Sequence, residues 1–261
     1  MPQLSDSRLT EPSALQSPAM ALTASTCPDC GGTGWTLRSA DGERIARECG
    51  CRKEESRRRR FRAAQVPERY RDCSFSDFND TNLALKKAKA VAQEFAAAYP
   101  VVEAGLLFLG PAGNGKTHLA IAILNEITQT KGRHALYANF SDLLMKIQST
   151  FKSDAPETKE DVITPYAEAE LLVLDELGAT KPSDFARDML YALLNTRYNH
   201  KRITIATSNY MDELSGGARE KLEDRIGYTL RSRLHEMCQT VKIQSDDFRE
   251  KVKRADFHAR Y

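Results

Sequence analysis

The sequence predicts an α/β fold whose core is a parallel five-stranded sheet with helices on its faces, preceded by a small metal-binding module. Three observations predict it. From residue 81 onward, short apolar segments typical of buried strands alternate with longer helical segments. The first of these strands leads into a glycine-rich loop and then a helix. Two pairs of closely spaced cysteines precede this region.

Composition limits the classes of protein to consider. The 261 residues are enough for one α/β domain and an extension. Lys and Arg total 38 against 36 Asp and Glu, a net charge of +2, so any nucleic-acid contact must be local. Neither a signal-peptide pattern nor an apolar run of about 18 residues occurs, so we expect a cytoplasmic protein without a membrane partner.

The N-terminal region divides into a tail and a cysteine module. Residues 1–25 mix Ser, Pro, Ala and Thr without a period and predict a disordered tail. Residues 26–53 form a module whose four thiolates suit a tetrahedral structural Zn²⁺; they are Cys27, Cys30, Cys49 and Cys51. The glycines after Cys30 fit a turn in which backbone N–H groups point at sulfur. A redox dithiol or unrelated cysteines are the alternatives, and a cytosolic compartment favours zinc.

A linker is expected over residues 54–80, before a main domain at 81–261. The basic run Arg52–Arg62 overlaps it and could contact nucleic-acid phosphates. It could equally be a solvated helix in which glutamates pair with arginines. Cys73 and Cys238 have no partner at metal spacing and are expected to be packed thiols.

The main domain alternates predicted helices and strands. An Ala- and Lys-rich helix over Asn82–Tyr99 ends before Pro100. The expected strands are Leu106–Leu109, Ala135–Ala138, Leu171–Leu174, Ile203–Thr207 and Val241–Ile243. The expected helices between them are Lys116–Thr130, Ser141–Thr150, Asp184–His200 and Leu222–Glu236. The polar segment Lys152–Thr164 is expected to be a mobile loop.

The glycine-rich loop has the spacing G-x-x-x-x-G-K-T of a P-loop. Its glycines let backbone N–H groups face a polyphosphate at a helix N-terminus, where the helix dipole favours negative charge. We therefore expect ATP here, with Lys116 at the β- and γ-phosphates and the Thr117 hydroxyl on Mg²⁺. The expected binding residues are Gly110, Pro111, Ala112, Gly113, Asn114, Gly115, Lys116, Thr117 and His118.

Two further strand ends carry polar residues. Asp175 ends a buried strand beside the P-loop, where it could hold Mg²⁺ through a water. Glu176 is then free for the attacking water. Asn209 follows the next strand, and its amide could bind the γ-phosphate or position that water, although Asn is also a common turn residue.

The last predicted helix carries a candidate for contact between subunits. Arg233 lies next to an apolar stripe formed by Leu222, Ile226, Leu230, Leu234 and Met237. It could project from the domain edge towards the γ-phosphate of a neighbouring subunit, or form a surface ion pair with Glu236.

The motifs GPAGNGKT, LLVLDELG, RYNHKRITIATSN, LRSRLHEMC and DDFR, in that order, resemble the DnaC/DnaI-type helicase loaders and the related IstB transposition ATPases. These form a branch of the AAA+ proteins close to DnaA, and the similarity runs from about Val66 to Arg249. It implies a sheet in the order 5-1-4-3-2 without a full helical lid. It also implies ATP hydrolysis, with Asp175 and Glu176 as the Walker B pair. Many loaders carry two aspartates there, but Glu is the commoner catalytic residue among AAA+ proteins.

The resemblance further implies Asn209 as sensor 1, Arg233 as an arginine finger, and Arg249 as a weak substitute for the usual lid arginine. The implied partners are a replicative helicase, single-stranded DNA and further copies of the chain in an oligomer. An IstB-like regulator of transposition on duplex DNA and a protein-remodelling ATPase remain alternatives. The cysteine module favours the loader, because it resembles a metal-bearing helicase-binding domain found in some loaders.

Single-stranded DNA could be bound by aromatic stacking with a nearby cation. The candidate residues are Tyr137, Phe140, Lys146 and Phe151. Tyr137 and Phe140 are explained equally well as core residues.

Overall fold

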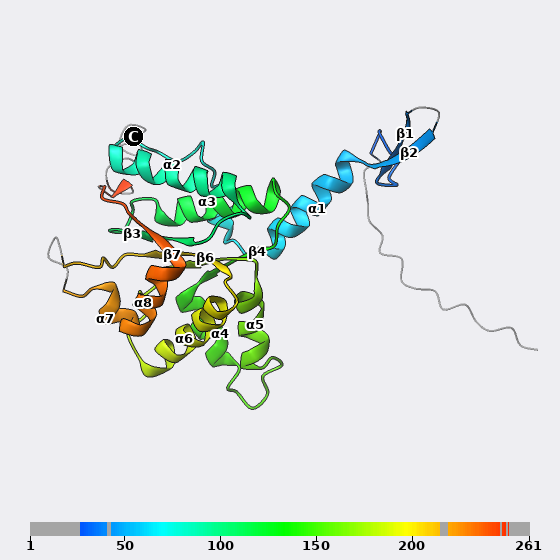
Figure 1. Ribbon diagram of the computed structural model, residues 1–261. Helices are drawn as coiled ribbons and strands as arrows, with labels where there is room; N and C mark the ends of the chain where they lie inside the picture. Colours follow the sequence, from blue (N-terminus) through cyan, green and yellow to red (C-terminus); the bar gives the residue numbers. More distant parts are fainter. Residues whose placement is uncertain (1–26, 41–42, 215–218, 246, 249, 251–261) are drawn as a thin grey trace, which may run out of the picture. The chain divides into compact units, whose positions relative to one another are not determined.

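The computed structural model describes residues 27–40, 43–214, 219–245, 247, 248 and 250 (Figure 1). The tail expected over 1–25 and the residue Arg249 lie outside the described residues. The chain divides between Glu54 and Glu55 into two compact units. The division falls within helix α1 (Gly50–Ala63).

The smaller unit consists of turns, a hairpin and the start of α1. Strands β1 (Trp35–Ala40) and β2 (Glu43–Glu48) pair antiparallel, with Trp35 opposite Glu48. The Cys49 N–H donates to the Gly34 carbonyl at 2.9 Å, just past the paired ends. The hairpin therefore brings the two cysteine pairs together, a role that the sequence alone did not assign to the polar stretch between them.

The larger unit contains the parallel sheet. Its strands are β3 (Gly105–Leu109), β4 (Ala135–Asn139), β5 (Leu171–Asp175), β6 (Ile203–Ser208) and β7 (Cys238–Lys242). They lie in the order β4-β5-β6-β3-β7, and each neighbouring pair is parallel. Counted from β3, this is the order 5-1-4-3-2, so the expected α/β fold and topology are confirmed.

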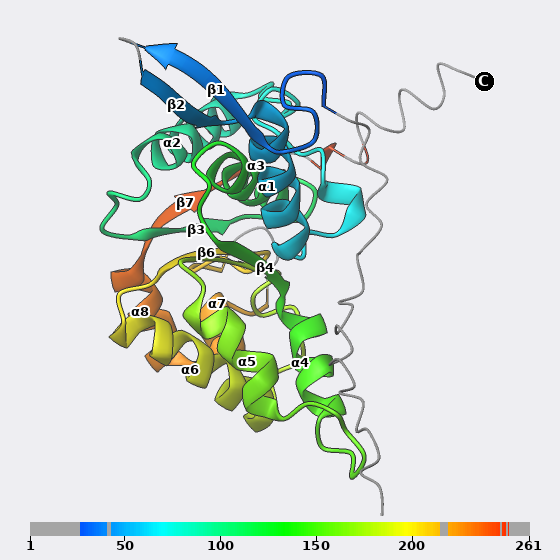
Figure 2. The same ribbon diagram turned by 90° about the vertical axis from the view of Figure 1, so that its right-hand side faces the viewer.

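Helices cover both faces of this sheet (Figure 1; Figure 2). One face packs against α2 (Leu83–Ala98) and α3 (Lys116–Gln129). The other packs against α4 (Phe140–Ser149), α5 (Lys159–Glu168), α6 (Asp184–Asn199), α7 (Leu222–Ile226) and α8 (Tyr228–Met237). Strand side chains alternate between the two cores: Phe108 faces α3, whereas Leu107 faces the opposite layer. No helix in the described part of the chain is long and apolar enough to cross a membrane.

The segment expected to be a linker contributes to the larger unit. A short 3₁₀ helix forms at Glu68–Tyr70, and Ala64, Val66 and Phe78 are buried. The Tyr137 N–H donates to the Ala64 carbonyl at 2.8 Å, which ties this segment to the edge strand β4.

Two arginines of the basic run donate hydrogen bonds to carbonyls in the last turn of α3. Arg57 Nε donates to the Gln129 carbonyl at 2.9 Å, and Arg60 Nε donates to the Thr128 carbonyl at 3.3 Å. The last carbonyls of a helix lack partners within it and carry the negative end of its dipole. These two guanidinium groups are therefore held by the fold.

The prediction of a mobile loop over Lys152–Thr164 is wrong in its second half. Helix α5 begins at Lys159, after a capping box in which Thr158 Oγ1 accepts from the Asp161 N–H and the Asp161 carboxylate accepts from the Thr158 N–H. Val162 is buried on the sheet. The high charge of the segment concealed this cap and its single buried position.

The single helix predicted over Leu222–Glu236 is also wrong. Gly227 has φ 89° and ψ 151°, which ends α7 and starts α8. The apolar stripe is nevertheless buried on both pieces: Leu222, Ile226, Leu230 and Leu234 are each 3% exposed or less, and Met237 packs against them partly buried. The periodicity therefore identified the buried face but not the break.

Candidate nucleotide-binding site

The P-loop joins β3 to α3 and depends on two glycines. Gly113 and Gly115 have φ values of 76° and 84°, in the left-handed region that favours glycine. A Cβ on Gly115 would lie 2.5 Å from Phe78 Cε2, and one on Gly113 would collide with the Asp247 carboxylate. Both the backbone conformation and the close neighbours therefore require glycine at these two positions.

Lys116 lies inside the loop and is 6% exposed. Its Nζ donates to the carbonyls of Gly110 and Pro111 at 2.8 Å each, and to Asn114 Oδ1 at 3.1 Å. The Asn114 Nδ2 in turn donates to the Ile243 carbonyl at 2.6 Å, just after β7. The loop thus holds a cation at its centre and is itself tied to the last strand.

Asp175 ends β5 beside the loop and is 2% exposed. Its Oδ1 accepts hydrogen bonds from the hydroxyls of Thr117 at 2.8 Å and Thr207 at 2.6 Å, and its Oδ2 accepts one from Tyr137 at 2.9 Å. Burial raises the pKa of Asp175, while the three hydroxyl donors act to lower it. The buried carboxylate and the neighbouring Thr117 hydroxyl both offer oxygen atoms, the ligands that Mg²⁺ prefers.

Glu176 and Asn209 are exposed and line the same cavity as the P-loop. Glu176 has φ 58°, and its N–H donates to Thr207 Oγ1 at 3.1 Å. Asn139 Nδ2 donates to Glu176 Oε2 at 3.0 Å, while the same side chain caps α4. The second acid of the pair is thus held at the cavity edge, where solvent reaches it.

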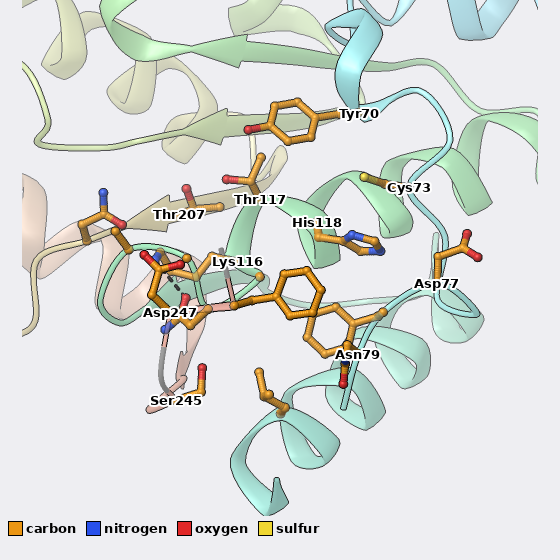
Figure 3. Close-up of a pocket in the computed structure, with 18 of the residues that line it drawn as sticks. Tyr70, Cys73, Asp77, Asn79, Lys116, Thr117, His118, Thr207, Ser245 and Asp247 are labelled. Atoms are coloured by element: carbon orange, nitrogen blue, oxygen red, sulfur yellow. Dashed lines mark hydrogen bonds between the residues drawn. The ribbon is translucent and has the colours of Figure 1, made fainter. Parts of the chain in front are cut away.

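The cavity has a volume of about 400 Å³. Besides the P-loop, residues from 69–85 and the chain after β7 line it, and these were not assigned to the site from the sequence. In Figure 3, Ser245 and Asp247 lie on one side of Lys116, and Asp77 and Asn79 lie on the other. Phe78 also packs on the P-loop, a contact that no sequence motif indicates.

His118 links the helix after the P-loop to the segment that precedes α2. One of its ring nitrogens, Nε2, lies 2.7 Å from the Ser74 carbonyl, and its ring meets Phe78 edge-on with 5.4 Å between centroids. The first turn of α3 is therefore fixed against the segment before α2.

Arg233 is not among the described residues that line the cavity. Its guanidinium lies over the rings of Tyr191 and Tyr198 on α6, at 4.6 and 5.5 Å from their centroids, and donates to the Tyr191 hydroxyl at 3.0 Å. The alternative partner, Glu236, instead accepts from the Tyr198 hydroxyl at 2.8 Å. Arg233 thus lies at a separate place on the domain, held by aromatic side chains.

The four predicted zinc ligands form one cluster in the smaller unit. Their sulfurs all lie within 4.8 Å of one another, with Cys27 and Cys49 at 3.8 Å and Cys30 and Cys51 at 3.5 Å. Tetrahedral Zn–S bonds of about 2.3 Å place sulfurs about 3.8 Å apart, so the cluster fits zinc. The Gly34 N–H donates to Cys30 Sγ at 3.3 Å, as expected for the turn after this cysteine.

Of the four residues considered for contact with single-stranded DNA, two are buried and two are exposed. Tyr137 and Phe140 are 5% and 4% exposed, so the interpretation that they stack on bases is wrong for both. Phe151 is 63% exposed and packs edge-on against Phe185, and Lys146 lies 3.8 Å from the Glu157 carboxylate. Of this set, only Phe151 and Lys146 are exposed.

Known proteins resemble much of this chain. The family described as "IstB-like ATP binding protein" matches residues 15–256. The replicative helicase loader DnaC of Escherichia coli (strain K12) is 25% identical over 169 residues, which cover 64% of this chain and 68% of the loader. DnaC of Buchnera aphidicola subsp. Baizongia pistaciae is 30% identical over 144 residues, 55% of this chain and only 58% of that protein.

Two further matches extend this result. The phage-like element PBSX protein XkdC of Bacillus subtilis is 25% identical over 224 residues, 81% of this chain and 79% of XkdC. A crystal structure of the DnaC helicase loader superposes with a TM-score of 0.60 and 27% identity, covering 68% of this chain and all of that chain. Because the family match spans both units and the P-loop, Asp175 and the parallel sheet agree with it, the chain belongs to the IstB-like ATP-binding proteins and contains an AAA+ domain like that of DnaC.

Proposed function

We propose that this protein is an ATPase that loads a replicative helicase onto single-stranded DNA, with its ATP state controlling its grip on both partners. The observation that carries the proposal is the match to the DnaC loader, whose entire crystallised chain is covered at 27% identity. The DnaC proteins of Buchnera aphidicola and Escherichia coli, at 30% and 25% identity, are also named replicative helicase loaders.

In the proposed reaction, the P-loop backbone and Lys116 bind the phosphates of ATP. Thr117 and Asp175 hold Mg²⁺, which would neutralise charge that develops on the phosphates. Glu176 orients and activates the attacking water from the cavity edge, and Asn209 hydrogen-bonds the γ-phosphate or that water. The chemistry is mainly positioning and charge stabilisation, so slow turnover is expected until the site is complete.

In an oligomer, Arg233 of an adjacent copy completes the site. A planar guanidinium suits the γ-phosphate oxygens, because it can donate two parallel hydrogen bonds. The cysteine cluster would hold a structural Zn²⁺ in a module that contacts the helicase. The support for the module's role is the resemblance to metal-bearing loaders, while the support for zinc is the sulfur geometry.

The test is co-purification of the tagged full-length chain with the replicative helicase encoded in the same genome. The binding is measured with ATP and Mg²⁺, with ADP, and without nucleotide, and Lys116→Ala serves as the control that cannot respond to nucleotide. Helicase capture that changes with nucleotide in the unaltered chain, and not in the control, supports the loader.

The family description favours a second candidate, an IstB-like regulator that forms ATP-dependent assemblies on duplex DNA. The same protein is therefore tested for ATP-dependent binding to double-stranded and single-stranded DNA. No helicase capture in any nucleotide state, together with ATP-dependent binding of duplex DNA, would contradict the loader and support this candidate.

A further inference from the structure

Tyr137 of β4 contacts the Walker B aspartate, although it lies outside every motif that carries the family resemblance. Its hydroxyl donates to Asp175 Oδ2 at 2.9 Å, whereas both threonine hydroxyls donate to Oδ1. Among the described residues, Tyr137 is thus the donor that holds the second carboxylate oxygen.

The contact is built into the sheet. Tyr137 pairs with Val173 across β4 and β5, and Asp175 is two residues further along β5, on the same face. A tyrosine side chain is long enough to span this diagonal. Tyr137 is 5% exposed and Asp175 is 2% exposed, so water does not compete for the carboxylate.

We infer that Tyr137 is a positioning residue for the Mg²⁺ side of the nucleotide site: its hydroxyl fixes the rotation of the Asp175 carboxylate, so that Oδ1 faces Thr117. This inference rests on the proposed function. Without the phenol, Oδ2 becomes a buried acceptor that has lost its donor. The carboxylate can then rotate more easily, and fewer molecules present Oδ1 turned towards Thr117. Binding of the phosphates by the P-loop without metal does not use this contact.

The test is Tyr137→Phe, which removes one oxygen and keeps the ring. The Mg²⁺ concentration for half-maximal ATP hydrolysis is expected to rise about 10-fold, the usual effect of losing a partner of a metal ligand. Affinity for a fluorescent ATP analogue in EDTA is expected to stay unchanged. The matched control is Tyr166→Phe, because Tyr166 is also buried and its hydroxyl donates to Gln65 at 2.7 Å, in the core on the other face of the sheet.

Each outcome has a distinct meaning. If the unaltered chain shows no Mg²⁺-dependent binding of ATP, the proposed function fails. If it shows such binding and Tyr137→Phe has the same Mg²⁺ dependence as Tyr166→Phe, only the role of Tyr137 is overturned.

The pair is tested further in an Asp175→Asn background, by Mg²⁺-dependent binding of the analogue. There, Tyr137→Phe is expected to add nothing, because its partner is already changed. A full effect in that background would show that Tyr137 acts on something other than Asp175. Melting curves set the temperature at which all variants are folded, so that a loss of stability does not mimic a loss of metal binding.

Discussion

Among single residues, Lys116 and Glu176 differ most clearly in environment. Lys116 is enclosed by loop carbonyls, whereas Glu176 is exposed at the cavity edge. Lys116→Ala removes the one charge at the centre of the loop and is expected to abolish ATP binding, since phosphate binding there depends on that cation. Isothermal calorimetry with ATP and Mg²⁺ checks this, and native affinity in Lys116→Ala would show that the nucleotide lies elsewhere.

Glu176→Gln keeps the shape of the side chain and its contact with Asn139 but removes the base. Nucleotide affinity is expected to remain within about 3-fold, while turnover falls by roughly 10² or more, the usual share of general-base catalysis. Phosphate release measured at saturating ATP separates the two effects. Turnover at the native rate would exclude Glu176 as the residue that activates water.

The sequence predicted the residues of this site that belong to a local pattern. Lys116 and Thr117 follow from the P-loop spacing, and Asp175 follows from its place at the end of a buried strand. The partners of Asp175 could not be predicted in this way, because Tyr137 is 38 residues away and Thr207 is 32 residues away. Only the register of β4, β5 and β6 brings these hydroxyls to one carboxylate.

A buried guanidinium group joins the ends of several helices and strands. Arg197 of α6 is fully buried, and its guanidinium donates to the carbonyls of Tyr166 and Ala169 at the end of α5, at 2.8 and 2.9 Å. It also donates to Thr204 Oγ1 on β6 at 2.8 Å. Periodicity predicted α6 but not this connection, since a charged residue on a helix is usually expected in solvent.

Arg197→Met is expected to lower the free energy of unfolding by about 3 kcal/mol or more, because several buried acceptors lose their donor at once. Urea denaturation measures the change. The control is Arg187→Met on the exposed side of the same helix, where a single exposed hydrogen bond to the Asp224 carbonyl is lost and about 1 kcal/mol or less is expected. Equal losses in the two variants would mean that the buried hydrogen bonds contribute little to stability.

The cysteine module gives a further prediction. The chain purified without added zinc is expected to contain about one equivalent, and Cys27→Ser/Cys30→Ser should lose most of it, because a site with half its thiolates cannot close around the ion. Elemental analysis measures the metal, and Cys73→Ser is the control because Cys73 lies outside the cluster. Unchanged zinc in the double variant would refute the site. ATP binding by the larger unit should persist, since that unit has its own core.

The sheet topology was predictable from the sequence, but the division of the chain into two units was predictable only in part. The alternation of strands with helices and the family motifs together predicted the 5-1-4-3-2 sheet. They did not indicate that residues after Glu54 pack in the larger unit, because Ala64 and Val66 directly follow the dense basic run Arg52–Arg62. Their burial depends on strand β4, which is far along the sequence.

The assembled state is where Arg233 is expected to act. Its guanidinium lies over Tyr191 and Tyr198, and Arg233 is not among the described residues that line the cavity, so we expect it to reach the γ-phosphate of a neighbouring copy. Arg233→Ala should leave the ATP affinity of the isolated chain intact, yet lower assembly-dependent hydrolysis by about 10³-fold, the effect of losing an arginine finger. Arg187→Ala is the control for loss of an exposed arginine.

Mixing Arg233→Ala with Lys116→Ala tests the shared site directly. Each variant lacks a different half of the junction, so mixed assemblies contain some junctions in which an intact P-loop meets an intact Arg233. Hydrolysis should therefore recover on mixing to a fraction set by the ratio of the two chains, and it should vanish when the mixture is diluted below the concentration at which assemblies form. If light scattering shows that the two variants assemble together and hydrolysis still does not recover, Arg233 acts within its own subunit or only stabilises α8 against α6. The position of Arg233 on the two tyrosines would then explain its presence without any role at the nucleotide.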